Sequence, residues 1–387
     1  MKWTDVRNLD GFKNVLSLGF SNVVGTAISG LFWLYLAVLL GEENYGELGY
    51  YIAIASVSYS ISMWGSSNAI TVYVAKGLKI EAPVYFSTLI STSIAAIVLF
   101  YSFDNIGLSI FVLGAVIFNL TQAELLGRKL YKKFSMYFLL QKILFVIFAI
   151  ILFYLMGPMG VLVGFGLSGI IFYKRIYNAL TKEKINFGII KEKFGFIANN
   201  YAQDLISKSY SSIDKLLIGP IFGFAILGNY YLGMQIFTLL AILPDIVLQY
   251  TLPKDSMEEN TKHLKIFVIL ISVGIAFLGA FAAPIVLPWF FPEFGEAPII
   301  ISILSFAIIP YTISNMLISK FLGEEKSRIY LISFVISFVV LIIGILVLGE
   351  ILGTIGLAMA FVISEIVKAG FLIIIKSVQI KSEDKHH

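Results

Sequence analysis

The residues that could carry chemistry in this chain are ionisable side chains within long apolar stretches. Each such charge costs about 2.5–3.5 kcal/mol at the centre of a transmembrane helix, so these side chains are expected to face a cavity or one another. They could bind a proton, an ion or a charged ligand. There are four bases and five acids: Lys142, Lys208, Lys215, Lys368, Glu124, Asp204, Asp214, Asp245 and Glu365.

The densest group lies in residues 198–215, which read ANNYAQDLISKSYSSIDK. Asp204 and Lys208 are one helical turn apart and can pair. At 1.5 Å per residue, Lys208 lies roughly 18 Å from the inner end of its helix, too deep for its ammonium group to reach the headgroups easily. Two interpretations remain open. The helix either lines a water-filled cavity, where Lys208, Asn199 and Asn200 contact substrate, or it packs through a buried ion pair.

The other ionisable groups also have two interpretations each. Lys142 either lines a site or extends to the headgroups. Asp245 follows Pro244, which bends a helix, so it marks either a gating or proton site or a structural kink. Glu365 and Lys368 have i,i+3 spacing and are expected to neutralise each other.

Three further features have structural interpretations. Asp214 and Lys215 are expected near the outer surface, although Asp214 stays a candidate cavity or ion-coupling residue. Glu124 is expected to pair with Arg128 at the inner end of a helix. The glycines of 157–169 favour close helix packing.

The helices that position these groups follow from composition. The 387 residues are 58% hydrophobic and 13% charged, whereas soluble proteins have about 25% charged residues. Twelve apolar stretches approach or exceed the roughly 20 residues that cross a bilayer, so we expect an all-α integral membrane protein. The stretches are 14–40, 46–73, 83–103, 106–127, 134–156, 158–178, 196–219, 222–252, 264–290, 297–321, 328–348 and 353–375.

The charges in the loops predict the orientation. One set of loops contains no lysine or arginine, and the opposite side holds 24 of the 28 basic residues. Cytoplasmic loops carry the excess of positive charge, so both termini are predicted to be cytoplasmic in a multi-pass protein of the cell (inner or plasma) membrane. The acids in the outer loops are Glu42, Glu43, Glu47, Asp104, Glu293, Glu296 and Glu350.

A long basic segment predicts two halves. The expected division is an N-terminal six-helix bundle at 1–178, a cytoplasmic amphipathic linker at 179–195 and a C-terminal six-helix bundle at 196–387. A weak repeat supports duplication: LLG and LGYY at 39–51 correspond to LIG and LGNYY at 217–231, about 180 residues later. An even number of spans in each half predicts a parallel repeat.

No catalytic or cofactor motif is present. The chain has three histidines and no cysteine, and it contains no zinc-protease, nucleophile-elbow, phosphate-loop or dinucleotide pattern. We therefore predict no enzyme activity, no catalytic residue, no metal site and no cofactor. A proton or sodium ion stays open as a coupling ion.

Residues 25–76 resemble the opening helices of Wzx-type polysaccharide flippases, in the polysaccharide-transport branch of the multidrug/oligosaccharidyl-lipid/polysaccharide (MOP) exporter superfamily. Residues 211–236 resemble the family's seventh and eighth helices. The residues that carry the resemblance are Leu40, Gly41, Tyr45, Gly46, Gly65, Asp214, Gly219, Gly228 and Tyr230.

The resemblance implies a fold and an activity. The fold is two six-helix bundles around a V-shaped central cavity. The activity is movement of a polyprenyl-diphosphate-linked oligosaccharide from the cytoplasmic to the outer leaflet by alternating access, for assembly of cell-surface polysaccharide such as O-antigen. Lys208, then Lys142 and Lys368, would hold the diphosphate, and Asp204, Asp245, Glu365 and Asp214 are cavity or ion-coupling candidates. Expected partners are the lipid-linked oligosaccharide, membrane lipids, a polysaccharide polymerase and glycosyltransferases, without nucleic acid.

Three other functions are alternatives to this one. The acids within the spans would suit a cation-coupled exporter of small amphipathic compounds, as in the drug-efflux branch of the same superfamily. The loop at 75–83 lacks the pattern often found in major-facilitator carriers. A membrane glycosyltransferase or ligase would need larger outer loops or an acidic catalytic motif.

Overall fold

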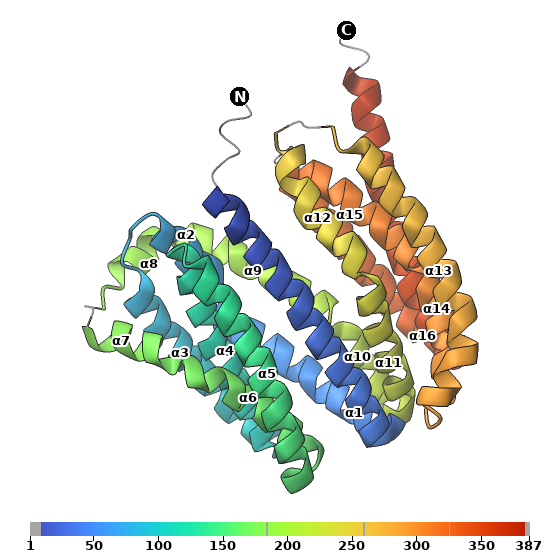
Figure 1. Cartoon of the computed structure of the whole chain (residues 1–387), viewed down its shortest axis with the longest axis horizontal. Coiled ribbons are helices and arrows are strands. Elements are labelled where there is room, and N and C mark those ends of the chain that lie inside the picture. The colour runs from blue at the N-terminus through green and yellow to red at the C-terminus, as the bar shows by residue number, and fades with distance from the viewer. Residues whose placement is uncertain (1–8, 183–184, 258–259, 325, 384–387) are drawn as a thin grey trace. The chain divides into compact units, whose positions relative to one another are not determined.

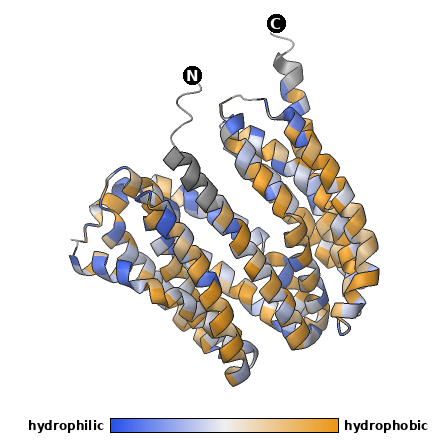
Figure 2. Ribbon diagram, viewed as in Figure 1, coloured by the Kyte–Doolittle hydropathy of each residue, from blue (hydrophilic) through white to orange (hydrophobic). Residues whose placement is uncertain are grey.

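The computed structural model describes residues 9–182, 185–257, 260–324 and 326–383, and all regular structure in these ranges is helical (Figure 1). Within them, eight helices are long and apolar enough to cross a membrane, or nine if the bent pair α11–α12 is one span. Figure 2 shows α13 orange along most of its length, as expected for a helix in lipid. The prediction of an all-α membrane protein is confirmed.

The chain forms two compact units. The first contains the chain up to Phe32 and residues 51–212, and the second contains residues 33–50 and the chain from Ile213 onward. α1 (Leu9–Met63) therefore contributes to both units. These units are groups of helices that contact one another, and they do not show how many times the chain crosses the membrane. The two six-helix bundles therefore stay a prediction.

The first unit contains α2 to α9 and two parts of α1. Its helices are α2 (Ser66–Ala75), α3 (Glu81–Phe103), α4 (Ile106–Gly127), α5 (Tyr131–Met156), α6 (Pro158–Ile170), the short 3₁₀ helix η2 (Ile171–Tyr173), α7 (Lys174–Lys182), α8 (Gly188–Glu192) and α9 (Phe194–Tyr210). α7 and α8 occupy much of the expected linker, and residues 183 and 184 lie outside the described ranges.

Glycines let α4 and α6 pack closely. A Cβ atom on Gly114 would lie 1.9 Å from the carbonyl oxygen of Gly166, and one on Gly166 would lie 2.1 Å from that of Ile110. No larger residue fits such a backbone contact. The interpretation of the glycines at 157–169 as packing residues is confirmed for Gly160, Gly164, Gly166 and Gly169. It is wrong for Gly157, which has positive φ at a turn and where a Cβ atom would meet nothing within 4 Å.

The second unit contains α10 to α16 and the central part of α1. Its helices are α10 (Ile213–Phe222), α11 (Phe224–Leu240), α12 (Ile242–Asp255), α13 (Lys262–Phe290), α14 (Ala297–Phe306), α15 (Ile308–Gly323) and α16 (Ser327–Glu383). A bend of 46° separates α11 from α12. Pro244 lies in the first turn of α12 and has no N–H to donate to the carbonyl of Leu240, which agrees with the kink expected there.

Glycine residues lie at several breaks between helical segments. The helix expected at 46–73 is interrupted at Trp64 and Gly65, which both have positive φ. Gly65 is required there because a Cβ atom would lie 2.4 Å from the carbonyl oxygen of Ile197. Gly41 and Gly353 have non-helical backbone angles and divide α1 and α16.

Two hairpins that are far apart along the chain have matching geometry. Gly157, between α5 and α6, has φ 66° and ψ −152°, and Gly353, within α16, has φ 59° and ψ −136°. A Cβ atom on Gly160, three residues after Gly157, would lie 2.1 Å from the carbonyl oxygen of Leu152. One on Gly356, three residues after Gly353, would lie 1.8 Å from that of Leu348. The same turn thus recurs 196 residues later.

Candidate functional site

A polar network joins α12, α15 and α16 in the second unit. Asp245 of α12 accepts hydrogen bonds at Oδ1 from the Tyr311 hydroxyl at 2.8 Å and from the Asn315 amide at 3.0 Å. Both donors belong to α15 and are one helical turn apart. Asp245 is partly buried and has no basic ion-pair partner among the described residues.

A buried ion pair lies on the other side of Tyr311. Lys368 Nζ is 2.6 Å from Glu365 Oε1, and these residues are only 2% and 1% exposed. The ammonium group also lies 5.6 Å from the ring centroid of Tyr311 and 4.9 Å from that of Phe334, within cation–π range. The predicted i,i+3 pair is confirmed.

The network therefore brings together three of the predicted site residues: Asp245, Glu365 and Lys368. Its two carboxylates and one ammonium group leave one formal negative charge when all are ionised. Such a charge is costly at membrane depth, and binding a proton or a monovalent cation would remove it. The arrangement can couple ion binding to the packing of three helices.

Polar residues of α9 form a second group, in the first unit. Asn200 donates to the Phe196 carbonyl at 2.8 Å and accepts from Asn68 of α2 at 3.0 Å. Asn199 and Lys208 are exposed, and Asp204 is partly buried. Lys208 is close enough to Asp204 to interact with it electrostatically. Among the described side chains, the ammonium and carboxylate groups of these two residues are not within ion-pair distance of each other. The Lys208 ammonium group is thus available to a ligand.

Lys142 and Asp214 lie apart from both groups. Lys142 is partly buried on α5, with Nζ 5.4 Å from the ring centroid of Phe138, and no carboxylate in the described ranges forms an ion pair with it. Asp214 is 2% exposed and pairs with Lys215 at 3.0 Å, so its charge is compensated within α10. Lys215 also lies over the Tyr231 ring.

A buried carboxylate cluster at the end of α4 extends the predicted Glu124–Arg128 pair, which is confirmed at 2.7 Å. Arg175 also binds Glu124 at 2.8 Å, and Arg128 reaches Glu81 at 2.8 Å. Burial acts to lower the pKa of Arg128, but the two carboxylates outweigh burial and raise that pKa above its ordinary value.

The sequence did not predict Glu81 or Arg175 in this cluster. Several basic residues occupy the same loops, and spacing along the chain does not distinguish among them. The cluster borders a cavity of about 560 Å³ between α4, α5 and α7.

These features define a multi-pass helical membrane protein with ionisable groups placed inside its helical units. The family described as "Polysaccharide biosynthesis protein" matches residues 35–265. The chain belongs to this family, which agrees with the resemblance to polysaccharide flippases noted from the sequence. It is a multi-pass membrane protein, as predicted.

Solved structures share the fold. An inward-facing multidrug resistance MATE family transporter of the MOP superfamily aligns with TM-score 0.73 and 17% identity over 93% of this chain and 95% of its own. The lipid II flippase MurJ, in an inward closed conformation, aligns with TM-score 0.72 and 16% identity over 95% and 87%.

A MOP superfamily transporter from Pyrococcus furiosus aligns with TM-score 0.63 and 16% identity over 96% of both chains. No curated protein matches the sequence.

Proposed function

We propose that this protein is a flippase for a polyprenyl-diphosphate-linked oligosaccharide. It would move this substrate from the cytoplasmic to the outer leaflet by alternating access, and glycosyltransferases and a polysaccharide polymerase would act before and after it. A sugar-diphosphate headgroup needs a polar path through hydrocarbon, while its lipid tail can remain in the bilayer. Membership of a polysaccharide biosynthesis family supports this substrate class.

The observation that carries the proposal is the set of polar side chains on α9. Lys208 is exposed, without an ion-pair partner in the described part of the chain, and Asn199 is exposed on the same helix. An ammonium group binds a diphosphate through short charge-assisted hydrogen bonds. Lys208 is therefore our principal diphosphate ligand, with Lys142 and Asn200 as further contacts. Lys368 is buried against Glu365, so its contact with substrate would require another conformation.

Twelve spans with cytoplasmic termini are part of the same proposal. α1 and α16 each count as two helices, because Gly41 and Gly353 divide them. The pairs α9–α10 and α11–α12 each count as one interrupted span, which gives twelve with the six other long helices. The matched hairpins at Gly157 and Gly353 support a parallel repeat of six spans.

The Asp245 network favours a second candidate, a cation-coupled exporter of small amphipathic compounds. Its uncompensated carboxylate would bind the coupling proton or sodium ion and, in this function, balance a cationic substrate. A coupled flippase could use the same carboxylate. The two functions therefore differ in the substrate, and transport of a lipid-linked oligosaccharide distinguishes them.

The test is reconstitution of the full chain with a fluorescent lipid-linked oligosaccharide in proteoliposomes. Lys208→Ala is expected to slow movement between leaflets at least tenfold, about the effect of losing one charge-assisted contact, and Lys208→Arg should retain most of it. Lys133→Ala removes an exposed lysine on the predicted cytoplasmic side, away from α9 in the sequence, and serves as the control. Wild-type rates in folded Lys208→Ala would exclude the role of Lys208. Dye efflux without oligosaccharide transport would favour the second candidate.

A further inference from the structure

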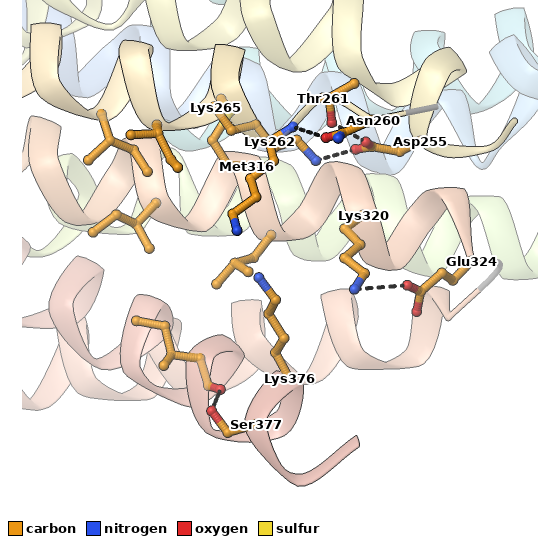
Figure 3. A pocket seen from close by; sticks show the side chains of 15 residues that line it. Asp255, Asn260, Thr261, Lys262, Lys265, Met316, Lys320, Glu324, Lys376 and Ser377 are labelled. Atoms are coloured by element: carbon orange, nitrogen blue, oxygen red, sulfur yellow. Dashed lines mark hydrogen bonds and ion pairs between the residues drawn. The ribbon is translucent and has the colours of Figure 1, made fainter. Parts of the chain in front are cut away.

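A lysine-rich pocket of about 840 Å³ lies wholly within the second unit. It is formed by the start of α13, the last turns of α15 and the residues around Lys376 of α16. Figure 3 shows Lys376 extending from α16 into the space between these helices. Lys262 and Lys265 lie on the opposite side of this space. The sequence places this region on the cytoplasmic side.

The pocket lining carries more positive than negative charge. Four lysines and two carboxylates line it, which leaves a formal charge of +2: Lys262, Lys265, Lys320, Lys376, Asp255 and Glu324. Like charges this close repel one another. An anion of one or two negative charges would relieve that repulsion.

Both carboxylates are already engaged. Asp255 accepts hydrogen bonds from Lys265, Thr261 and Ser319. Burial acts to raise the pKa of Asp255, but these hydrogen bonds outweigh burial and lower the pKa below its ordinary value. Asp255 therefore stays ionised and neutralises Lys265.

Glu324 is shared between two lysines. Its carboxylate lies 2.7 Å from Lys326 Nζ and 3.5 Å from Lys320 Nζ. Lys262 and Lys376 consequently have no ion-pair partner among the described residues, although both ammonium groups border the pocket.

The remaining wall is apolar and partly open. Ile266 and Ile373 are 46% and 45% exposed, and Ile269, Ile313 and Leu317 complete this side. All of these residues belong to helices long and apolar enough to cross a membrane. A ligand that fits has an anionic head beside the lysines and a hydrocarbon chain along the isoleucines.

We propose that this pocket binds the phosphate of an anionic glycerophospholipid from the cytoplasmic leaflet, with Lys262 and Lys376 as its principal ligands. Basic pockets between transmembrane helices suit such headgroups. The alkyl chain would lie against Ile266 and Ile373. This site is distinct from Lys208, which belongs to the other unit, and it does not depend on which substrate the protein transports.

Native mass spectrometry of the purified full chain in mild detergent tests the proposal, with phosphatidylglycerol, phosphatidylcholine and inorganic phosphate as probes. We expect wild-type protein to retain phosphatidylglycerol preferentially. Lys262→Gln/Lys376→Gln should weaken that binding about 10- to 30-fold, from the loss of two surface-type charge contacts, and the double arginine variant should restore it. Lys132→Gln/Lys133→Gln removes two exposed lysines of the first unit and should bind like wild type.

Three results would overturn the proposal. The first is equal retention of both lipids, and the second is unchanged binding in the Lys262→Gln/Lys376→Gln protein. The third is binding of inorganic phosphate that depends on these lysines without any preference for phosphatidylglycerol, since the ligand would then be a free anion. Thermal unfolding of each variant confirms that it is folded.

Discussion

Gly46 of α1 and Gly228 of α11 occupy reciprocal positions at one backbone contact. A Cβ atom on Gly46 would lie 1.9 Å from the carbonyl oxygen of Phe224, and one on Gly228 would lie 1.8 Å from that of Glu42. Residues 42 and 46 precede 224 and 228 by the same 182 positions. The contact is therefore reciprocal: each glycine lets its own helix approach the backbone of the other.

This contact predicts the effect of a single methyl group. Gly228→Ala places a Cβ atom inside the Glu42 carbonyl and should destabilise the protein by about 1–3 kcal/mol, the usual cost of overpacking. Gly274→Ala is the control, because its Cβ atom meets no atom within 4 Å and alanine favours a helix. Thermal unfolding in detergent measures both, and equal midpoints for the two variants would contradict the prediction.

In the Glu365–Lys368 pair, the effect of substituting one residue on the stability of the protein should depend strongly on whether the other residue is present. Lys368→Met leaves Glu365 charged and buried, which should cost about 3–5 kcal/mol. Glu365→Met/Lys368→Met removes both charges and should recover most of that stability. The double-mutant cycle is measured by unfolding, and additive effects of the two single substitutions would show that the pair does not act as a unit.

Asp245 predicts the ion dependence of transport, on the basis of the proposed function. Asp245→Asn keeps the shape of the side chain but removes the charge that a proton or sodium ion would neutralise. Transport in proteoliposomes should lose its response to an imposed proton or sodium gradient. Glu43→Gln, at an exposed acid of a predicted outer loop, is the matched control. A gradient response that persists in Asp245→Asn would exclude this residue as the coupling site.

Asp255 predicts a loss of stability in acid. Its pKa is lowered in the folded protein, so the folded state binds fewer protons than the unfolded state, whose aspartate pKa is about 3.9. The stabilisation is present above that value and is lost as the pH falls toward the folded pKa. Asp255→Asn should therefore unfold at a lower temperature than wild type at pH 7, with a smaller difference near pH 3.5. A constant difference across this range would contradict the assignment.

The sequence was sufficient for interactions within one helix. Glu365 with Lys368 and Glu124 with Arg128 are three and four residues apart, and helical geometry alone places such side chains together. It was also sufficient for the membrane class, because charge is too scarce for a soluble surface, and for the family, whose glycine and tyrosine signatures are local.

The tertiary structure decided which distant groups meet. Asp245 and Tyr311 are 66 positions apart, and Glu124 and Arg175 are 51 apart. Many polar residues at similar depth could have been their partners. Likewise, Lys262 and Lys376 border one pocket only because α13 and α16 lie on its opposite sides. Helix periodicity fixes the face on which a side chain lies, whereas packing between helices selects its neighbour and hence the charge that it experiences.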